Sequence, residues 1–234
     1  MAKSGFPLEK EGPRPDVPGA SPSFLVVAGG QEPKPERLRA LLPPSSTVIA
    51  ADGGWRLCQQ LGLKTDLLVG DMDTLRPEEV EQARLEGTEV RRYPADKDES
   101  DLEIAILGAH AMGARKLSLL GALGGQWDHC LLNLLAPLSL CHSLGIWARL
   151  LTSDAEIYLL PPGNYRLTGQ QGTRVSLAAL SPLVEGLTLS GFLYPLEGAT
   201  LARKQTLGLA NAVREPQASL SLSAGEIMLV MIRE

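Results

Sequence analysis

The sequence predicts an α/β N-terminal domain with a mostly parallel sheet covered by helices, followed by an all-β antiparallel sandwich as the C-terminal domain. From Ser23 onward, short apolar runs alternate with helical patterns, and near-continuous apolar runs are typical of parallel strands buried on both faces. After about Thr152 the texture changes to short runs separated by Pro, Gly, Asn and Ser, which is typical of antiparallel sandwiches and barrels. We therefore expect a flexible tail at residues 1–22, an α/β domain at 23–153 and a β-sandwich at 154–234.

The N-terminal domain contains five segments that we predict to be strands, and four of them end at a glycine or a polar residue. These strands are residues 24–28, 47–51, 67–69, 89–93 and 116–120, and the helices between and after them are 35–42, 55–61, 77–86, 102–112 and 128–135. In open sheets of this kind the ligand crevice lies outside the carboxyl ends of the strands. Four turns fall at such ends, and their convergence predicts a site. They are Ala28-Gly29-Gly30, Asp52-Gly53-Gly54, Gly70-Asp71-Met72-Asp73 and Gly121-Ala122-Leu123-Gly124-Gly125.

The C-terminal domain contains six shorter runs that we also predict to be strands. They are residues 156–160, 165–167, 174–180, 187–189, 219–222 and 227–232.

Composition excludes several classes of protein. At 234 residues with 44% apolar and 21% charged residues, the chain is typical of a globular protein with a sizeable core. Its net charge of −5 and the lack of a basic stripe argue against a nucleic-acid partner. Three cysteines without a C-x-x-C pair argue against a disulfide framework or a structural zinc site. No apolar run has the length of a membrane span or a signal peptide, so we expect a cytoplasmic protein that does not enter membranes.

Two acidic clusters carry the strongest chemical signal. Asp96 to Glu103 holds five carboxylates within eight residues, and Asp71 and Asp73 follow the predicted strand 67–69. Each cluster is either a solvated surface or a set of hard oxygen ligands for a divalent cation such as Mg²⁺, which proteins bind together with substrate phosphates. Their position after strands favours the metal.

In the cluster that follows the predicted strand 67–69, Asp71 and Asp73 are two residues apart, a spacing that can point both carboxylates the same way. The alternative is an Asx-type turn in which Asp73 caps the next element. A preceding glycine and a buried strand favour the metal.

In the cluster from Asp96 to Glu103, Ser100 and Glu103 form the pattern of a capping box at a helix start, so Glu103 is better explained as a cap than as a ligand. Asp101 can serve the helix dipole or a metal, and Asp98 is free to reach a ligand. Lys97 either pairs with these acids or contacts a phosphate as a point charge.

The glycine-rich turn at Gly124 and Gly125 would let backbone N–H groups approach a phosphate at the start of the next helix. Asp128 is predicted to cap that helix and can also touch substrate, whereas His129 and Asn133 share a helix face and suit a buried hydrogen bond. Neither a G-x-G-x-x-G nor a G-x-x-x-x-G-K-[ST] motif occurs, which argues against Rossmann and P-loop proteins.

Taken together, four segments resemble, in order, the motif set of thiamine pyrophosphokinases, A-D-G-G, G-D-x-D-S, D-x-D-x-T-D and G-G-R-x-D-H. The segments are Ala51-Asp52-Gly53-Gly54, Gly70-Asp71-Met72-Asp73-Thr74, Asp96-Lys97-Asp98-Glu99-Ser100-Asp101 and Gly124-Gly125-Gln126-Trp127-Asp128-His129. The resemblance extends from about Phe24 to the C-terminus. It implies a homodimer with its active site at the subunit interface, and transfer of a pyrophosphoryl group from Mg·ATP to the thiamine hydroxyl.

The resemblance also implies roles for individual residues. Asp71, Asp73 and Asp101 match the metal-binding acids of the family, with Asp98 a near neighbour. Lys97 and Ser100 would face the phosphates, and Asp52 with Gly53 would border the nucleotide. The proton of the thiamine hydroxyl would pass to Asp98 or Asp71.

Two segments of the C-terminal domain extend the resemblance. Residues 190–196 resemble the G-x-x-W-P-L segment of the family, and residues 206–211 resemble its G-x-S-N segment, which is associated with the thiamine site. Tyr194 and Asn211 are therefore expected to bind substrate.

The sequence departs from the family pattern at three positions. Gln126 stands where an arginine is common, Tyr194 replaces tryptophan and Ala210 replaces serine. Two alternatives therefore stay open: a Mg²⁺-dependent nucleotide hydrolase, and a nucleotide- or thiamine-binding sensor without catalysis.

Overall fold

The computed structural model describes residues 7–11, 23–32, 34–43, 46–168 and 170–233. Within them the chain forms two compact units. The N-terminal unit holds the described residues from 23 to 153. The C-terminal unit holds residues 154–233 together with the short segment 7–11.

A parallel sheet forms the centre of the N-terminal unit. Its strands run in the order β7-β6-β2-β3-β4-β5, and each adjacent pair is parallel. The strands are β2 (Ser23–Val27), β3 (Ser46–Ala51), β4 (Leu67–Gly70), β5 (Glu89–Arg92), β6 (Lys116–Leu120) and β7 (Trp147–Leu151). The strand order reverses beside β2, which lies between β3 and β6, so the carboxyl ends of β2 and β6 border a topological switch point.

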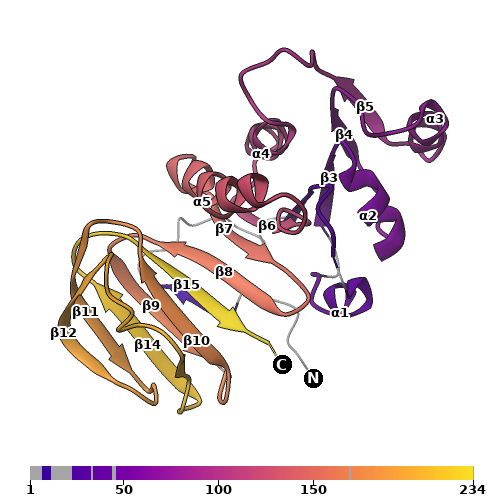
Figure 1. Ribbon diagram of the computed structural model, residues 1–234. Helices are drawn as coiled ribbons and strands as arrows, with labels where there is room; N and C mark the ends of the chain where they lie inside the picture. Colours follow the sequence, from indigo (N-terminus) through magenta and orange to yellow (C-terminus); the bar gives the residue numbers. More distant parts are fainter. Residues whose placement is uncertain (1–6, 12–22, 33, 44–45, 169, 234) are drawn as a thin grey trace. The chain divides into compact units, whose positions relative to one another are not determined.

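Five helices accompany this sheet. They are α1 (Pro35–Arg39), α2 (Gly54–Leu61), α3 (Pro77–Leu85), α4 (Asp101–Ala111) and α5 (Trp127–Ser143). Helices α4 and α5 lie on one face of the sheet, and α1, α2 and α3 lie on the other (Figure 1). Because both faces are covered, β2 and β3 are buried on both sides, which explains why their sequences read as continuous apolar runs.

Two details of the N-terminal unit differ from the sequence prediction. Strand β7 was not predicted, because Arg149 interrupts its apolar run. In the structure Arg149 is only 1% exposed, and its Nε donates to Ser118 Oγ at 3.0 Å. The predicted end of α5 at residue 135 is wrong, since the helix continues through Pro137 to Ser143. Leu138 and Cys141 are buried beyond the proline, so packing outweighs the lost backbone hydrogen bond.

The C-terminal unit consists of strands in antiparallel pairs. One set runs in the order β13-β10-β15-β8 and the other in the order β1-β9-β14-β11-β12. Their bounds are β1 (Leu8–Lys10), β8 (Ala155–Leu160), β9 (Gly163–Thr168), β10 (Arg174–Ala179), β11 (Leu183–Ser190), β12 (Leu196–Ala202), β13 (Asn211–Ala212), β14 (Gln217–Leu222) and β15 (Ile227–Ile232). Burial alternates along β9, β10 and β14, as expected for strands with one buried face.

The N-terminal segment corrects the prediction of a flexible tail. Leu8–Lys10 is a strand that pairs with β9, and Leu8 is fully buried. Residues 1–6 and 12–22 of the predicted tail lie outside the described residues. Strand β12 was also missed, because only one of its seven residues is buried and it has no apolar run. In its coarse form the predicted fold class is confirmed: the protein is rich in strands, with few helices and a mixture of parallel and antiparallel pairing.

Candidate functional site

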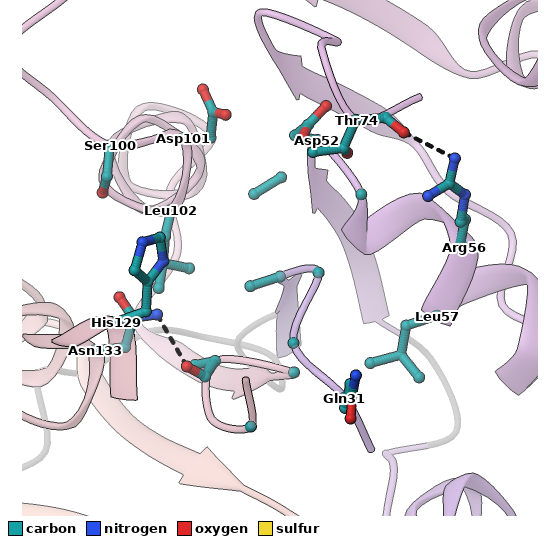
Figure 2. Close-up of a pocket in the computed structure, with 18 of the residues that line it drawn as sticks. Gln31, Asp52, Arg56, Leu57, Thr74, Ser100, Asp101, Leu102, His129 and Asn133 are labelled. Atoms are coloured by element: carbon teal, nitrogen blue, oxygen red, sulfur yellow. Dashed lines mark hydrogen bonds between the residues drawn. The ribbon is translucent and has the colours of Figure 1, made fainter. Parts of the chain in front are cut away.

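Three carboxylates meet at the carboxyl edge of the parallel sheet. Asp52 follows β3, Asp71 follows β4 and Asp101 is the first residue of α4, and one oxygen from each lies within 4.8 Å of the others. Strands β3 and β4 are adjacent and parallel, so the turns that follow them necessarily lie side by side. Asp52 and Asp101 face each other across the opening between α4 and the end of β3 (Figure 2).

Gly70 makes this close approach possible. A Cβ atom at this position would lie 3.0 Å from Asp52 Cβ and 3.1 Å from Asp101 Cγ, and its φ of +142° is one that other residues rarely adopt. Asp52 is itself in the left-handed region, with φ of 44°. A non-glycine residue held there is uncommon and is often found at functional positions.

Asp52 contributes a carboxylate oxygen that is available for a ligand. The residue is only 8% exposed, and its Oδ2 accepts a hydrogen bond of 2.5 Å from Thr74 Oγ1. Its Oδ1 is buried and has no hydrogen-bond partner among the described residues. A buried carboxylate oxygen without a partner is unfavourable, and a cation would satisfy it.

The pKa values of two neighbouring acids are raised, for different reasons. Burial raises the pKa of Asp101, and the hydrogen bond from Lys97 opposes this rise. Repulsion from Asp71 is the main reason that the pKa of Asp73 is raised. A divalent cation would relieve both effects, and three carboxylates are the hard oxygen ligands that Mg²⁺ prefers.

Lys97 is paired with the cluster. Its Nζ lies 3.0 Å from Asp101 Oδ1 and donates to the carbonyl of Pro94 at 3.1 Å. The hydrogen bond to Asp101 raises the pKa of Lys97, so the ammonium stays charged. Both predicted uses of Lys97 remain compatible, since the residue pairs with an acid and also borders the cleft.

An open cleft of about 1370 Å³ extends from the carboxylates along the carboxyl ends of β2, β3 and β6. Its lining includes Asp52, Gly53, Lys97, Ser100, Asp101 and Gly124. Gln31, His129 and Asn133 line the cleft farther from Asp52 (Figure 2), and Gln126 is also among the lining residues. The cleft therefore lies across the topological switch point, where open α/β sheets bind ligands.

The structure separates the predicted site residues into two groups. Asp52, Asp71 and Asp101 come together, whereas Asp73 is exposed and does not belong to this set of three. The exposed residues Asp98, Gly125 and Asp128 do not line the cleft.

The capping predictions had mixed outcomes. Ser100 and Glu103 form the predicted capping box, with hydrogen bonds of 3.2 and 2.8 Å. Asp128 is not the N-cap of α5, because the helix already begins at Trp127; its Oδ1 accepts instead from the His129 backbone. Asp73 does not cap α3, whose N-cap is Arg76.

Other residues of the glycine-rich turn and of Gly70-Asp71-Met72-Asp73-Thr74 have local roles. Asp71 Oδ1 accepts from the Asp73 backbone at 3.1 Å, so Asp71 makes the local turn contact. Asn133 forms a hydrogen bond of 2.9 Å to the carbonyl of Ala122, which fixes the turn after β6 to α5.

Sequence reasoning missed Arg56 and gave no role to Thr74. Arg56 lies on α2 and borders the cleft, and its guanidinium contacts both Glu79 and Thr74. The signal available in the sequence was the cation two residues after the Asp52-Gly53-Gly54 turn, beside an acidic site.

In the C-terminal unit, Asn211 is a structural clamp. It is 5% exposed, its Oδ1 accepts from the Tyr194 backbone at 2.9 Å, and its Nδ2 donates to the Tyr194 carbonyl at 2.8 Å. The ring of Tyr194 is 61% exposed. The arrangement suits Asn211 to holding Tyr194 in place, and leaves its amide little capacity to bind substrate directly.

Fold and site together define a class of protein: an α/β unit with three clustered carboxylates beside a cleft at its switch point, joined to an all-β unit. A family model described as "Thiamin pyrophosphokinase, catalytic domain" matches residues 38–145, which include all three clustered carboxylates. Among curated proteins, the thiamine pyrophosphokinase of Bacillus subtilis (strain 168) is 27% identical over 209 residues, covering 89% of this chain and 96% of the relative. Thiamine pyrophosphokinase 1 of Oryza sativa subsp. japonica is 26% identical over 182 residues, covering 73% of this chain and 67% of the relative.

Solved structures give the same result. The crystal structure of thiamine pyrophosphokinase from Bacillus subtilis aligns with a TM-score of 0.80 at 25% identity, covering 91% of this chain and 99% of that one. In sequence and in fold the chain is similar to thiamine pyrophosphokinases, and its residues 38–145 match the catalytic-domain model of that family.

Proposed function

We infer that this protein is a thiamine diphosphokinase, which transfers the pyrophosphoryl group of ATP to the hydroxyl of thiamine and releases AMP. The observation that carries this conclusion is the meeting of Asp52, Asp71 and Asp101 beside a cleft that Asp52 and Asp101 line, within the region that matches the catalytic domain of the family. Among the described residues, no helix is long and apolar enough to cross a membrane.

The cofactor is proposed to be Mg²⁺, held by Asp52, Asp71 and Asp101, with Asp73 close enough for its charge to interact with Asp71. The donor set supports this choice, because it consists of carboxylates and includes the unpartnered Oδ1 of Asp52. When bound, the metal would neutralise phosphate charge and stabilise the leaving AMP.

The other residues of the cleft are proposed to position the ATP phosphates. Lys97 and Ser100 border the cleft at the start of α4, and Gly124 borders it at the turn before α5. A glycine turn followed by a helix N-terminus presents backbone N–H groups to an anion. Phosphoryl-type transfer depends mainly on such positioning and on charge stabilisation.

The finer domain assignment follows from the same reasoning. Residues 23–153 are proposed to be the nucleotide- and metal-binding catalytic domain, and residues 154–234 the domain that binds thiamine and contributes to dimerisation. The exposed ring of Tyr194, held by Asn211, supports a role for the second domain in binding an organic cation such as thiamine.

The protein is further proposed to act as a cytoplasmic homodimer. Helix α5 carries exposed Trp127, Leu131 and Leu135 at intervals of four residues, so they form one apolar stripe. A second copy of this chain is the proposed cover for this stripe, in line with the family resemblance. Light scattering should then report twice the mass of 25.0 kDa.

AMP release from ATP and Mg²⁺, measured with and without thiamine, tests the activity. AMP that appears only with thiamine, together with an equal amount of thiamine diphosphate, is the expected result. AMP formed equally fast without thiamine would identify a nucleotide hydrolase. Ligand binding without turnover would identify a sensor.

A further inference from the structure

The carboxylate of Asp52 is held in one orientation by a neighbour without an assigned role. Thr74 Oγ1 donates to Asp52 Oδ2 at 2.5 Å, and this bond leaves Oδ1 as the oxygen without a hydrogen-bond partner among the described residues. One oxygen of Asp52 lies within 4.8 Å of an oxygen of Asp71 and of Asp101. Without the threonine hydroxyl, Asp52 could rotate about its Cβ–Cγ bond, because that torsion has a broad energy profile.

Gly53 provides the space for this hydroxyl. A Cβ atom on Gly53 would lie 2.9 Å from Thr74 Oγ1, closer than real Cβ contacts allow. Gly53 therefore leaves room for the Thr74 hydroxyl, which orients the carboxylate of Asp52.

The backbone of Thr74 is fixed in turn by Arg56. The guanidinium of Arg56 donates to the Thr74 carbonyl at 2.8 Å, and Figure 2 shows this contact beside Asp52. Arg56 itself is held by Glu79 through two hydrogen bonds, of 2.8 Å from Nε and 2.7 Å from a terminal nitrogen. A bidentate pair of this kind fixes direction as well as distance.

Glu79 belongs to the first turn of α3, where it also accepts from the Arg76 backbone at 2.8 Å. The residue is 9% exposed, and the hydrogen bond from Arg56 holds the pKa of Glu79 well below its usual range. Helices α2 and α3 are thereby joined to the turn that carries Thr74.

We propose that Thr74, supported by the Arg56–Glu79 pair, is a positioning residue that directs the free oxygen of Asp52 onto the catalytic divalent cation. The proposal rests on the proposed function, since it deepens the account of the same cleft. Groups that orient metal ligands in this way typically change metal affinity by about 10- to 100-fold when they are removed.

The test compares Thr74→Val, which removes the hydroxyl at nearly constant volume, with Thr74→Ser, which keeps it. Binding of Mn²⁺ alone is measured by electron paramagnetic resonance, and the Mg²⁺ concentration at half-maximal AMP formation is measured in parallel. For Thr74→Val we expect the dissociation constant for Mn²⁺ and the half-maximal Mg²⁺ concentration each to rise by about tenfold. For Thr74→Ser we expect both values to stay close to those of the unaltered protein.

Two matched variants control for general effects. Thr88→Val removes a hydroxyl of the same N-terminal unit that donates to the Thr65 carbonyl at 3.0 Å, away from the cleft. Arg91→Met breaks the exposed pair of Arg91 with Glu89 and serves as the control for Arg56→Met. Neither control should change Mn²⁺ binding, whereas Arg56→Met should weaken it by about threefold to tenfold because it acts one step further from the metal.

Unchanged Mn²⁺ binding in Thr74→Val would overturn the proposal, as would equal weakening in Thr74→Ser or in the Thr88→Val control. The proposed function fails separately, if the unaltered protein forms no AMP in the presence of thiamine. The Mn²⁺ measurement still decides the role of Thr74 in that case, because it needs neither ATP nor turnover.

Discussion

The two units of this protein use their polar side chains in opposite ways. In the N-terminal unit, carboxylates converge at the sheet edge, and Asp52 retains a buried oxygen without a partner among the described residues. In the C-terminal unit, the amide of Asn211 is occupied by the backbone of Tyr194, and the side chain left exposed is aromatic. The first arrangement suits charge chemistry, and the second suits holding an apolar binding surface in place.

The largest expected effect tests the first half of this comparison. Asp101→Asn should lower kcat for AMP formation by at least about 100-fold, because a metal site contributes several kcal/mol to transition-state stabilisation. Asp101 is partly buried and begins α4, where asparagine also fits, so far-ultraviolet circular dichroism should be unchanged. Steady-state kinetics at saturating thiamine measures the loss.

The control for this variant is Glu86→Gln, which changes an exposed carboxylate at the end of α3, away from the cleft. Asp98→Asn is informative beside it. Since Asp98 is exposed and does not line the cleft, a loss of less than about tenfold is expected, whereas a loss as large as that of Asp101→Asn would restore Asp98 as the general base.

The second prediction tests the clamp in the C-terminal unit. Asn211→Ala removes three side-chain hydrogen bonds, two with Tyr194 and one from the Ala212 backbone, so we expect a loss of about 2–3 kcal/mol in the free energy of unfolding. Asn211→Asp keeps an acceptor but loses the donor, so its loss in the free energy of unfolding should be smaller than that of Asn211→Ala. Chemical denaturation provides the measurement, with the exposed Asn164→Ala as control.

The same variants separate a clamp from a direct substrate contact. If Asn211 acts through Tyr194, the variant that loses more stability should also show the larger rise in the KM for thiamine. Asn211→Ala should therefore exceed Asn211→Asp in both. A rise in KM without any loss of stability would instead return Asn211 to the set of residues that touch thiamine.

The third prediction concerns the exposed ring. Tyr194→Ala should raise the KM for thiamine by about 2- to 30-fold, the range of a cation–π contact, while leaving the KM for ATP unchanged. Because the ring is 61% exposed, the melting temperature should hardly change. Tyr194→Trp, which restores the family residue, should lower the KM or leave it unchanged. A KM for thiamine that is insensitive to both variants would remove Tyr194 from the site.

The two units also differed in how far their sequences predicted them. Most strands and helices of the N-terminal unit were predicted within a few residues, because burial on both faces produces continuous apolar runs. Strand β7 was missed because a buried arginine, Arg149, breaks that pattern. In the C-terminal unit, β12 was missed because only one of its seven residues is buried, and its pairing with β11 leaves little trace in hydrophobicity.

For the site, sequence order identified turns that lie together in the folded chain. Asp71, Asp73 and Asp101 were predicted as metal ligands, and the carboxylate cluster of the structure contains Asp71 and Asp101 together with Asp52. Spacing along the chain could not reveal this, because it depends on the left-handed backbone of Asp52 and on the missing side chain of Gly70. The contact from Arg56 to Thr74 joins residues 18 positions apart and is visible only in the folded chain.

The smallest expected effect tests whether Asp73 stands outside the set of ligands. Repulsion from Asp71 raises the pKa of Asp73 above its unfolded value, so the protonated form favours folding. The resulting stability is fully present below the unfolded pKa, near 4, and is lost as the pH rises through the folded pKa. Without divalent cations, Asp73→Asn should therefore raise the melting temperature at pH 7 by less than about 2 °C, and should have no effect near pH 3.

Differential scanning calorimetry with and without Mg²⁺ completes the test. If Mg²⁺ stabilises Asp73→Asn as much as the unaltered protein, Asp73 tunes the charge around the site from outside it. If the variant loses the stabilisation by Mg²⁺, Asp73 is a ligand after all, and the set of three carboxylates is incomplete without it.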